Sequence, residues 1–444
     1  MGEPRIIPRE AHRISRRDID PDALKVLYRL RQGNHAAYLV GGSVRDLLLG
    51  RRPKDFDIGT SAHPYQVKKL FRNCWVIGRR FRLAHVKFGQ KVIEVATFRR
   101  QLQPDEQAAQ QAALAHSPAL AHSPAPAHSP ASAHTGETDA APEVNDAHLI
   151  RRDNTFGTPE EDAFRRDFTI NALFYDIATF SIIDYVNGME DLEAGLVRSI
   201  GDPEVRFLED PVRMLRAVAL AARLDFAIDP PVLEAIRLHR HTIATSAPPR
   251  LLEEYYKILR SGCAEKTFRG LAHAGLLKPI SAELHQGADE PLWKSLAAVD
   301  AYRRNFESVP ATLTNAVLLG SLLVPLGFPP ENARHSAPAS ILRLGDLPLA
   351  RRDVEGLRQI LSLQQRLRDL GAHPRAKRAL THRHSFLDTL TWMDIHGRSP
   401  DIVGHWKTAL AERGTEHPPA EALESEPPFR RRRRRRRRRV RPAP

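Results

Sequence analysis

The stretch YLVGGSVRDLLLGRRPKDFDIGT, from Tyr38 to Thr60, contains the strongest indication of the fold. Its apolar start ends in a Gly-Gly pair, a short helical pattern follows, and a second strand-like segment, DFDIGT, completes it. A strand, a glycine turn, a helix and a second strand predict an α/β unit. The glycines Gly41 and Gly42 let backbone amides approach a phosphate closely at the start of the helix, and Arg45 adds a cation there.

Two acids of this stretch, Asp55 and Asp57, stand in a segment expected to be extended, where aspartate is disfavoured. In a strand their side chains would point the same way, with Cα atoms about 6.6 Å apart. Two such carboxylates can bind one hard cation or a pair of them, although a solvated strand edge is the simpler explanation. Glu94, in the apolar strand KVIEVATF, is expected to be buried. It is then either a third metal ligand or one half of an ion pair with Lys87 or Arg99.

The segment RRDFTINALFYD places Asp167 at the expected start of an apolar helix, where the helix dipole favours an acid. Taken alone, Asp167 is expected to cap this helix. Because Arg165 and Arg166 stand beside it, the segment also suits the binding of a phosphate.

The segment EDPVR offers a second such helix start. Asp210 is expected as the N-cap and Pro211 as the first helical residue. Glu209 and Arg213 then lie close enough to form a pair near that start, and this role is compatible with contacts to a base.

Four segments together resemble one known family. They are 38–60, VIGRRFRLAHVKFGQKVIEVATFRR (76–100), RDNTFGTPEEDAFRRDFTINALFYD (152–176) and EDPVRMLRAVALAARL (209–224). The resemblance is to the class II template-independent RNA nucleotidyltransferases, which include CCA-adding tRNA enzymes and bacterial poly(A) polymerases. GRRFRLAHVKFG and NTFGTPEEDAFRRDF, followed by a helical body and an Arg-rich tail, are more similar to the poly(A) polymerases.

The resemblance implies a role for each motif. Asp55 and Asp57 would bind catalytic magnesium, with Glu94 as third carboxylate, and Asp167 would belong to the catalytic site. The nucleotide ATP would be held by Gly41, Gly42, Arg45, Arg165, Arg166, Glu209, Asp210 and Arg213. The implied activity is the transfer of AMP from ATP to RNA 3′ ends, in RNA processing and decay. A CCA-adding enzyme and a non-catalytic RNA-binding protein are the alternatives.

Composition sets the context of this activity. The 444 residues carry a net charge of +14, which favours a polyanionic partner, and only two cysteines, which suits a reducing cytoplasm. The N-terminus has no apolar signal segment, and no window is apolar enough to span a membrane. The run Arg430–Arg439 is expected to be an unfolded tail that contacts RNA or another acidic surface.

The fold expected from these patterns is α+β, an α/β nucleotidyltransferase head followed by helices. The expected domains are an N-terminal helical extension (1–35), the head (36–178) with a disordered His-Ser-Pro insertion (101–147), a helical neck for nucleotide recognition (179–270), a helical RNA-binding body (271–412) and a disordered tail (413–444).

Overall fold

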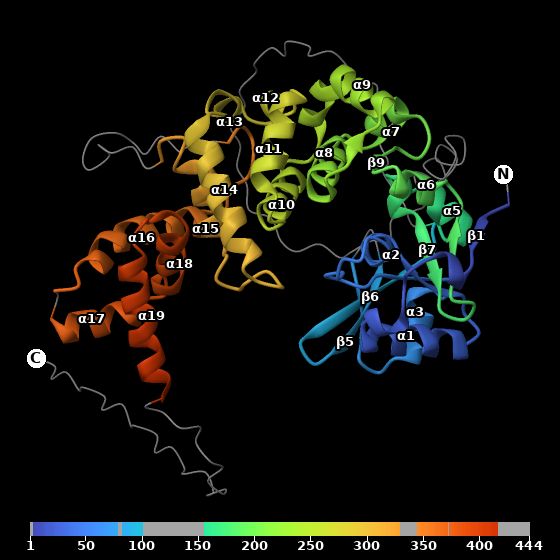
Figure 1. Ribbon diagram of the computed structural model, residues 1–444, viewed down its shortest axis with the longest axis horizontal. Helices are drawn as coiled ribbons and strands as arrows, with labels where there is room; N and C mark the ends of the chain where they lie inside the picture. Colours follow the sequence, from blue (N-terminus) through green and yellow to red (C-terminus); the bar gives the residue numbers. More distant parts are fainter. Residues whose placement is uncertain (1–2, 79–81, 101–154, 329–343, 372, 416–444) are drawn as a thin grey trace, which may run out of the picture.

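The computed structural model describes residues 3–78, 82–100, 155–328, 344–371 and 373–415. The expected insertion at 101–147 and the Arg430–Arg439 run lie outside these residues. The described chain is an α+β structure that curves into an arc, with a sheet at one end and helices along the rest (Figure 1). The fold class predicted from the sequence is confirmed.

The described strands of the head form one eight-stranded sheet in the order β1-β8-β7-β2-β3-β6-β5-β4. Neighbouring strands are antiparallel except β3 and β6, which are parallel. The strands are β1 (Arg5–Ile7), β2 (Ala37–Val40), β3 (Ile58–Thr60), β4 (Cys74–Ile77), β5 (Leu83–Phe88), β6 (Lys91–Thr97), β7 (Leu173–Asp176) and β8 (Ser181–Asp184).

Both faces of the central strands are buried, so their sequences are apolar at consecutive positions. Leu39 faces a large core with α1 (Pro21–Gln32) and α3 (Pro64–Leu70), whereas Val40 faces a smaller core around Phe98 and Phe174. Successive side chains of these strands alternate between the two cores and so fix the strands in the sheet. The loop after β2 and the loop before β3, where the site lies, are thereby held in position.

Three predictions about elements need correction. Asp55 and Asp57 precede β3 rather than lie within it. The apolar segment after Asp167 is not a helix but a 3-10 turn, η4 (Thr169–Asn171), followed by β7, because Leu173 and Phe174 fill different cores on the two sides of the sheet. The segment 1–35 is not a separate extension, since β1 pairs with β8 and α1 packs on the head.

Helices make up the rest of the arc. Those of the head and neck are α2 (Gly42–Leu48), α5 (Pro159–Phe164), α6 (Gly188–Glu193), α7 (Pro203–Glu209), α8 (Val212–Leu224), α9 (Pro230–His239) and α10 (Pro248–Leu259). Beyond them come α11 (Ala264–His273), α12 (Leu277–Ile280), α13 (Ala282–Gln286), α14 (Glu290–Arg304), α15 (Asn315–Leu323), α16 (Arg351–Arg368), α17 (Pro374–Thr381), α18 (Phe386–His396) and α19 (Pro400–Thr415). The short turns η1 (Arg9–Ala11), η2 (Arg16–Asp18) and η5 (Arg240–Thr245), with the two-stranded ladder β9 (Leu196–Val197) and β10 (Ala227–Ile228), complete the elements.

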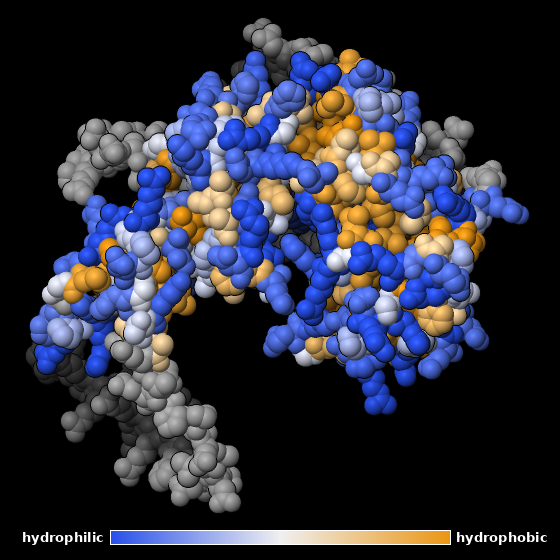
Figure 2. Space-filling model, in the orientation of Figure 1, coloured by the Kyte–Doolittle hydropathy of each residue, from blue (hydrophilic) through white to orange (hydrophobic). Residues whose placement is uncertain are grey.

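One hydrophobic core runs from the head through the neck to α18, and a smaller core joins α16 to α19. Hydrophilic residues line the concave side of the arc, between the head and the helices (Figure 2). None of the helices in the described part of the chain is long and apolar enough to cross a bilayer.

Candidate active site

A cleft of about 1110 Å³ lies where the head meets the neck. The head contributes α2, the loop before β3 and the segment after α5, and the helical part contributes the α7–α8 junction, α8 and α10. Eleven of the twelve residues predicted from the sequence to form the site line this cleft, and only Glu94 does not. The eleven are Gly41, Gly42, Arg45, Asp55, Asp57, Arg165, Arg166, Asp167, Glu209, Asp210 and Arg213.

The start of α2 forms the glycine wall of the cleft. Gly41 has a φ of +72°, a conformation that strains other residues, and a Cβ on it would lie 3.0 Å from Nη1 of Arg166. The first amides of α2 have no partner within the helix, so they remain available for an anion. Arg45 is buried, and its guanidinium donates to the Asp46 carboxylate and the Asn171 amide oxygen. In this structure Arg45 therefore links α2 to η4 at the cleft wall.

The carboxylates predicted to bind metal lie at the head side of the cleft. Asp57 is open to the cleft but surrounded by its walls, and the resulting desolvation, with the nearby Glu94 and Asp55 carboxylates, raises its pKa to about 6. Glu94 is not buried as expected. Its side chain is half exposed, and Oε1 lies 3.7 Å from Nε2 of His85 on the paired strand β5.

The donor set suits a divalent ion held partly by its substrate. Within the described residues, no three His, Cys, Asp or Glu side chains are arranged to hold a metal by themselves. Mg²⁺ commonly uses one or two carboxylates together with substrate phosphates, and Asp55 and Asp57 provide such a pair. Desolvation and the neighbouring negative charges raise the pKa of Asp57, and a cation there would offset this penalty on its charged form.

The two arginines of the RRD motif are held by one acid. Arg165 Nη2 lies 2.7 Å from Asp162 Oδ1, and Arg166 Nη2 lies 2.9 Å from Oδ2 of the same carboxylate. Burial opposes ionisation of Asp162, but these two guanidinium groups outweigh it and hold its pKa below the usual value. Asp162 thus fixes both arginines at the cleft wall.

Asp167 is buried, and protein groups contact both of its carboxylate oxygens. Its Oδ1 accepts from the Phe168 amide at 2.8 Å and from Asn171 Nδ2 at 3.3 Å, and Oδ2 lies 2.7 Å from Nη2 of Arg216 on α8. Burial works against its ionisation, but Arg216 and these hydrogen bonds hold the pKa of Asp167 below its usual value. In this structure Asp167 links head to neck.

The opposite wall contains the EDxxR motif at the α7–α8 junction. Helix α8 begins at Val212, one residue later than predicted, and Asp210 Oδ1 accepts from the Val212 amide at 3.3 Å. Arg213 Nη1 donates to Glu209 Oε2 at 3.1 Å. Arg250 of α10 forms a two-pronged ion pair with Asp210 at 2.8 and 2.7 Å. These side chains present both donors and acceptors to the cleft.

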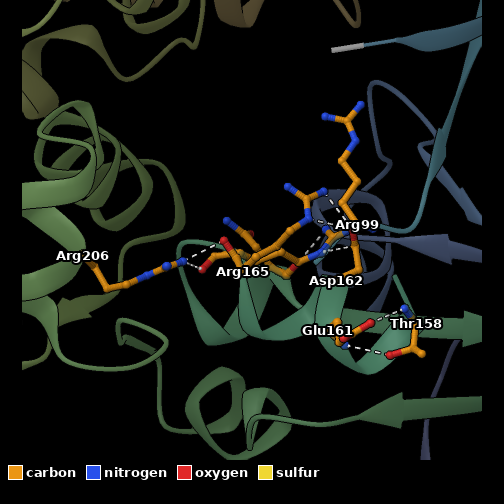
Figure 3. A network of polar contacts seen from close by, with 8 residues as sticks. Arg99, Thr158, Glu161, Asp162, Arg165 and Arg206 are labelled. Atoms are coloured by element: carbon orange, nitrogen blue, oxygen red, sulfur yellow. Dashed lines mark hydrogen bonds and ion pairs between the residues drawn. The ribbon is translucent and has the colours of Figure 1, made fainter. Parts of the chain in front are cut away.

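Arg206 of α7 connects this wall to the head (Figure 3). Its Nη2 donates to the carbonyl oxygens of both Arg165 and Arg166 at 2.7 Å, and Nη1 donates to Glu209 Oε2 at 2.9 Å. The Arg206 carbonyl in turn accepts from Arg213 Nη1 at 3.0 Å. Arg206 therefore fixes the EDxxR motif relative to the RRD motif.

The part of the cleft between the loop before β3 and the C-terminal end of α8 is strongly basic. In all, the lining has twelve arginine and lysine side chains against seven carboxylates. Lys54 of the head and Arg223 of α8 both line it, and neither side chain has a hydrogen bond or ion pair within the described residues. Burial between the walls, with Arg45 and Arg51 nearby, lowers the pKa of Arg223.

Sequence reasoning missed four residues that organise the site. Asp162 stands three and four positions before the RRD arginines, and Arg216 stands three after Arg213, so helical spacing was a usable signal for both. Arg206 stands three positions before Glu209, which is the same kind of local signal. Its contacts to the carbonyls of Arg165 and Arg166 had no such signal, because they join positions 40 or more apart. The same holds for the pairing of Arg250 with Asp210.

Comparison with known proteins finds family models of polymerase A that match this chain. Residues 37–198 match the family model of the poly A polymerase head domain. Residues 225–287 match a probable RNA and SrmB-binding site of polymerase A, and residues 327–441 match the polymerase A arginine-rich C-terminus.

Curated relatives include two bacterial poly(A) polymerases. The chain is 48% identical over 275 residues to "Poly(A) polymerase I" of Salmonella typhi, covering 62% of this chain and 53% of that protein. It is 44% identical over 298 residues to the protein of the same name from Escherichia coli O6:H1, covering 66% and 58%. The matched part thus spans little more than half the length of these relatives.

Among solved structures, the chain resembles the Bacillus stearothermophilus CCA-adding enzyme in complex with CTP. The TM-score is 0.54 at 25% identity, over 90% of this chain and 83% of that one. The sequence motifs, the fold and three consecutive family matches agree, and this chain belongs to the nucleotidyltransferase family of poly(A) polymerases and CCA-adding enzymes.

Proposed function

We propose that the protein is a polynucleotide adenylyltransferase of the cytoplasm, which adds AMP from ATP to RNA 3′ ends without a template. The observation that carries this proposal is the cleft itself. Asp55 and Asp57 line it from the head and the Glu209–Arg213 segment lines it from the neck, which supports a nucleotide bound between them. Identity of 44–48% to curated poly(A) polymerases supports adenylate addition, and such an enzyme would serve RNA processing and decay.

The described residues suggest how the cleft would work. The amides at the start of α2 and the Arg165–Arg166 pair would bind the triphosphate. Asp55 and Asp57, with Glu94 nearby, would hold Mg²⁺, which supplies activation of the RNA 3′-hydroxyl and neutralisation of the leaving pyrophosphate. Arg213 and the acids Glu209 and Asp210 would donate to and accept from the adenine edge. Catalysis by these groups is mainly positioning and charge stabilisation.

The CCA-adding reaction is a second candidate, because the similar solved structure is a CCA-adding enzyme. A binding protein without catalysis is the third.

The test offers one single-stranded RNA primer and, separately, a tRNA ending before CCA, with each NTP alone and with all four. The proposal predicts a long ladder with ATP alone. A stop after one to three additions that need both CTP and ATP indicates the CCA enzyme, and no extension indicates the binding protein.

A further inference from the structure

The basic end of the cleft has no assigned ligand. Its cations come from three separate parts of the chain. Lys54 stands in the loop before β3, Arg223 near the end of α8, and Arg304 at the end of α14. We refer to these three residues as the cross-cleft cluster.

The cluster contains more cations than its surroundings neutralise. Arg304 Nη1 donates only to the Gly262 carbonyl, at 3.2 Å, among its described contacts, and Lys54 and Arg223 have no hydrogen bond or ion pair there. Asp55 and Asp46 are the acids that act on Lys54, but Arg303 and Arg223 act on it more strongly. Gathering such cations between two walls costs free energy unless an anion joins them.

Both substrates of the proposed reaction, the RNA and ATP, carry phosphates that would suit these cations, and the position along α8 distinguishes the two. Arg213, at the start of α8, belongs to the segment proposed to contact the base of ATP. Arg223 lies ten residues further along the same helix, about 15 Å away at the helical rise. Asp55 directly follows Lys54, so a phosphate at Lys54 lies beside the carboxylates proposed to hold the metal.

The fixed position of the loop before β3 supports a built site. Arg51 Nη1 and Nη2 donate to the carbonyls of Arg223 and Leu224, both at 3.2 Å, at the C-terminal end of α8. A cation at this end is favoured by the helix dipole. These contacts hold Lys54 and Arg223 on facing walls at a defined separation.

We propose that Lys54 and Arg223, supported by Arg304, bind the backbone phosphates at the 3′ end of the RNA primer and so direct its hydroxyl toward Asp55 and Asp57. The proposal rests on the proposed function for the identity of the polyanion. The same cations could instead bind the triphosphate of ATP. The experiment below distinguishes RNA binding from ATP binding.

The experiment measures RNA binding without nucleotide or metal, by fluorescence anisotropy of a 5′-labelled single-stranded oligoadenylate with the full chain. The double variant Lys54→Ala/Arg223→Ala is compared with Lys69→Ala/Arg72→Ala, which removes two exposed cations of the head outside the cleft. We expect each cluster substitution to raise the RNA Kd about tenfold or more. The slope of log affinity against log salt should fall by about 1.4 in the double variant, since two phosphate contacts are lost. The control should bind within about twofold of wild type.

Two further readings make the outcome decisive. Lys54→Arg keeps the cation and should restore most of the affinity, which a merely structural role of Lys54 does not predict. An unchanged RNA Kd in the double variant, or a higher KM for ATP with unchanged RNA affinity, overturns the proposal. Because binding is measured without catalysis, failure of wild type to extend RNA with ATP refutes the adenylyltransferase function alone, and the Kd comparison still decides the cluster.

Discussion

Asp57, at the head side of the cleft, is the carboxylate whose charge its surroundings disfavour. Desolvation between the walls, with the charges of the nearby Glu94 and Asp55, raises its pKa to about 6. Such an arrangement is unfavourable for the protein alone and favourable once a divalent cation binds. The structure therefore suggests a metal test that does not depend on activity.

Asp57→Asn should raise the Tm of the metal-free protein at pH 7.5 by more than at pH 5. The folded-state pKa of Asp57 is above its unfolded value, so wild type is stabilised by a proton at low pH and loses that stability as pH rises through about 6. Asparagine removes the penalty that is fully present at pH 7.5. Thermal unfolding in EDTA measures it, with Asp401→Asn on α19 as the exposed control. An equal effect at both pH values contradicts the prediction, as does an equal rise in Tm on adding Mg²⁺ to wild type and variant.

Arg213→Lys should weaken discrimination between ATP and the other NTPs more than it weakens triphosphate binding. Lysine keeps the charge but loses the planar fork that now reaches Glu209 and the Arg206 carbonyl. Loss of one hydrogen bond to a charged group corresponds to roughly 10- to 150-fold in selectivity. The measurement is kcat/KM for ATP, CTP and GTP, with Arg237→Lys on α9 as control. Unchanged ratios would mean that Arg213 only supports the start of α8.

At the scale of elements, the site depends on contacts between segments that the chain keeps far apart. Helix α7 reaches the RRD segment through Arg206, α8 through Arg216, and α10 reaches the EDxxR segment through Arg250. In each case an arginine from the neck joins an acid or a carbonyl at the cleft. The contacts of Arg206 and Arg216 make the relative position of head and neck part of the active site, and the contact of Arg250 fixes the EDxxR segment within the neck.

Removing the Arg206 side chain should therefore affect both stability and selectivity. Arg206→Ala leaves the carbonyls of Arg165 and Arg166 without their donor, and we expect a loss of about 3 kcal/mol in the free energy of unfolding. NTP selectivity should fall as well, because Glu209 loses a positioning contact. Urea unfolding and NTP competition measure the two effects, beside Arg237→Ala. Loss of stability with selectivity intact would restrict Arg206 to a structural role.

Close packing at β3 offers a second element-scale prediction. A Cβ on Gly59 would lie 2.7 Å from the Phe98 ring and 3.0 Å from Val40, both in the core under the site. Gly59→Ala should therefore destabilise the protein by about 1–3 kcal/mol and lower activity through the nearby Asp57. Gly404→Ala, in open space on α19, is the matched control and should be neutral or slightly stabilising. Equal Tm values for the two variants would refute this packing argument.

Across the molecule, local patterns predicted the fold class and most of the cleft. Strong signals such as the Gly-Gly turn after β2 and the helix that follows it agree with the structure, since they act within a few residues. The helix expected after Asp167 was wrong because tertiary burial on both faces of β7 overrides a helical pattern. The burial of Glu94 was wrong because apolar neighbours do not reveal which face of β6 is covered.

Assembly of the cleft could not be predicted from spacing. Lys54 and Arg223 stand more than 160 positions apart in the chain, and only the curvature of the arc brings the head opposite the end of α8 (Figure 1). The continuous core from the head to α18 holds this curvature, so the two walls form one unit. The site consequently requires head and neck to act together around Asp55 and Asp57.

The most direct test of that account is the rate of RNA extension with ATP and Mg²⁺ by Asp55→Ala and Asp57→Ala, measured beside RNA affinity. We predict that each variant loses extension by at least about a hundredfold, since loss of a metal site removes several kcal/mol of transition-state stabilisation. RNA Kd should stay within about twofold, because the basic lining remains, and Asp401→Ala should behave as wild type. Retention of more than about a tenth of the wild-type rate by either variant would contradict the assignment of these carboxylates to the catalytic centre.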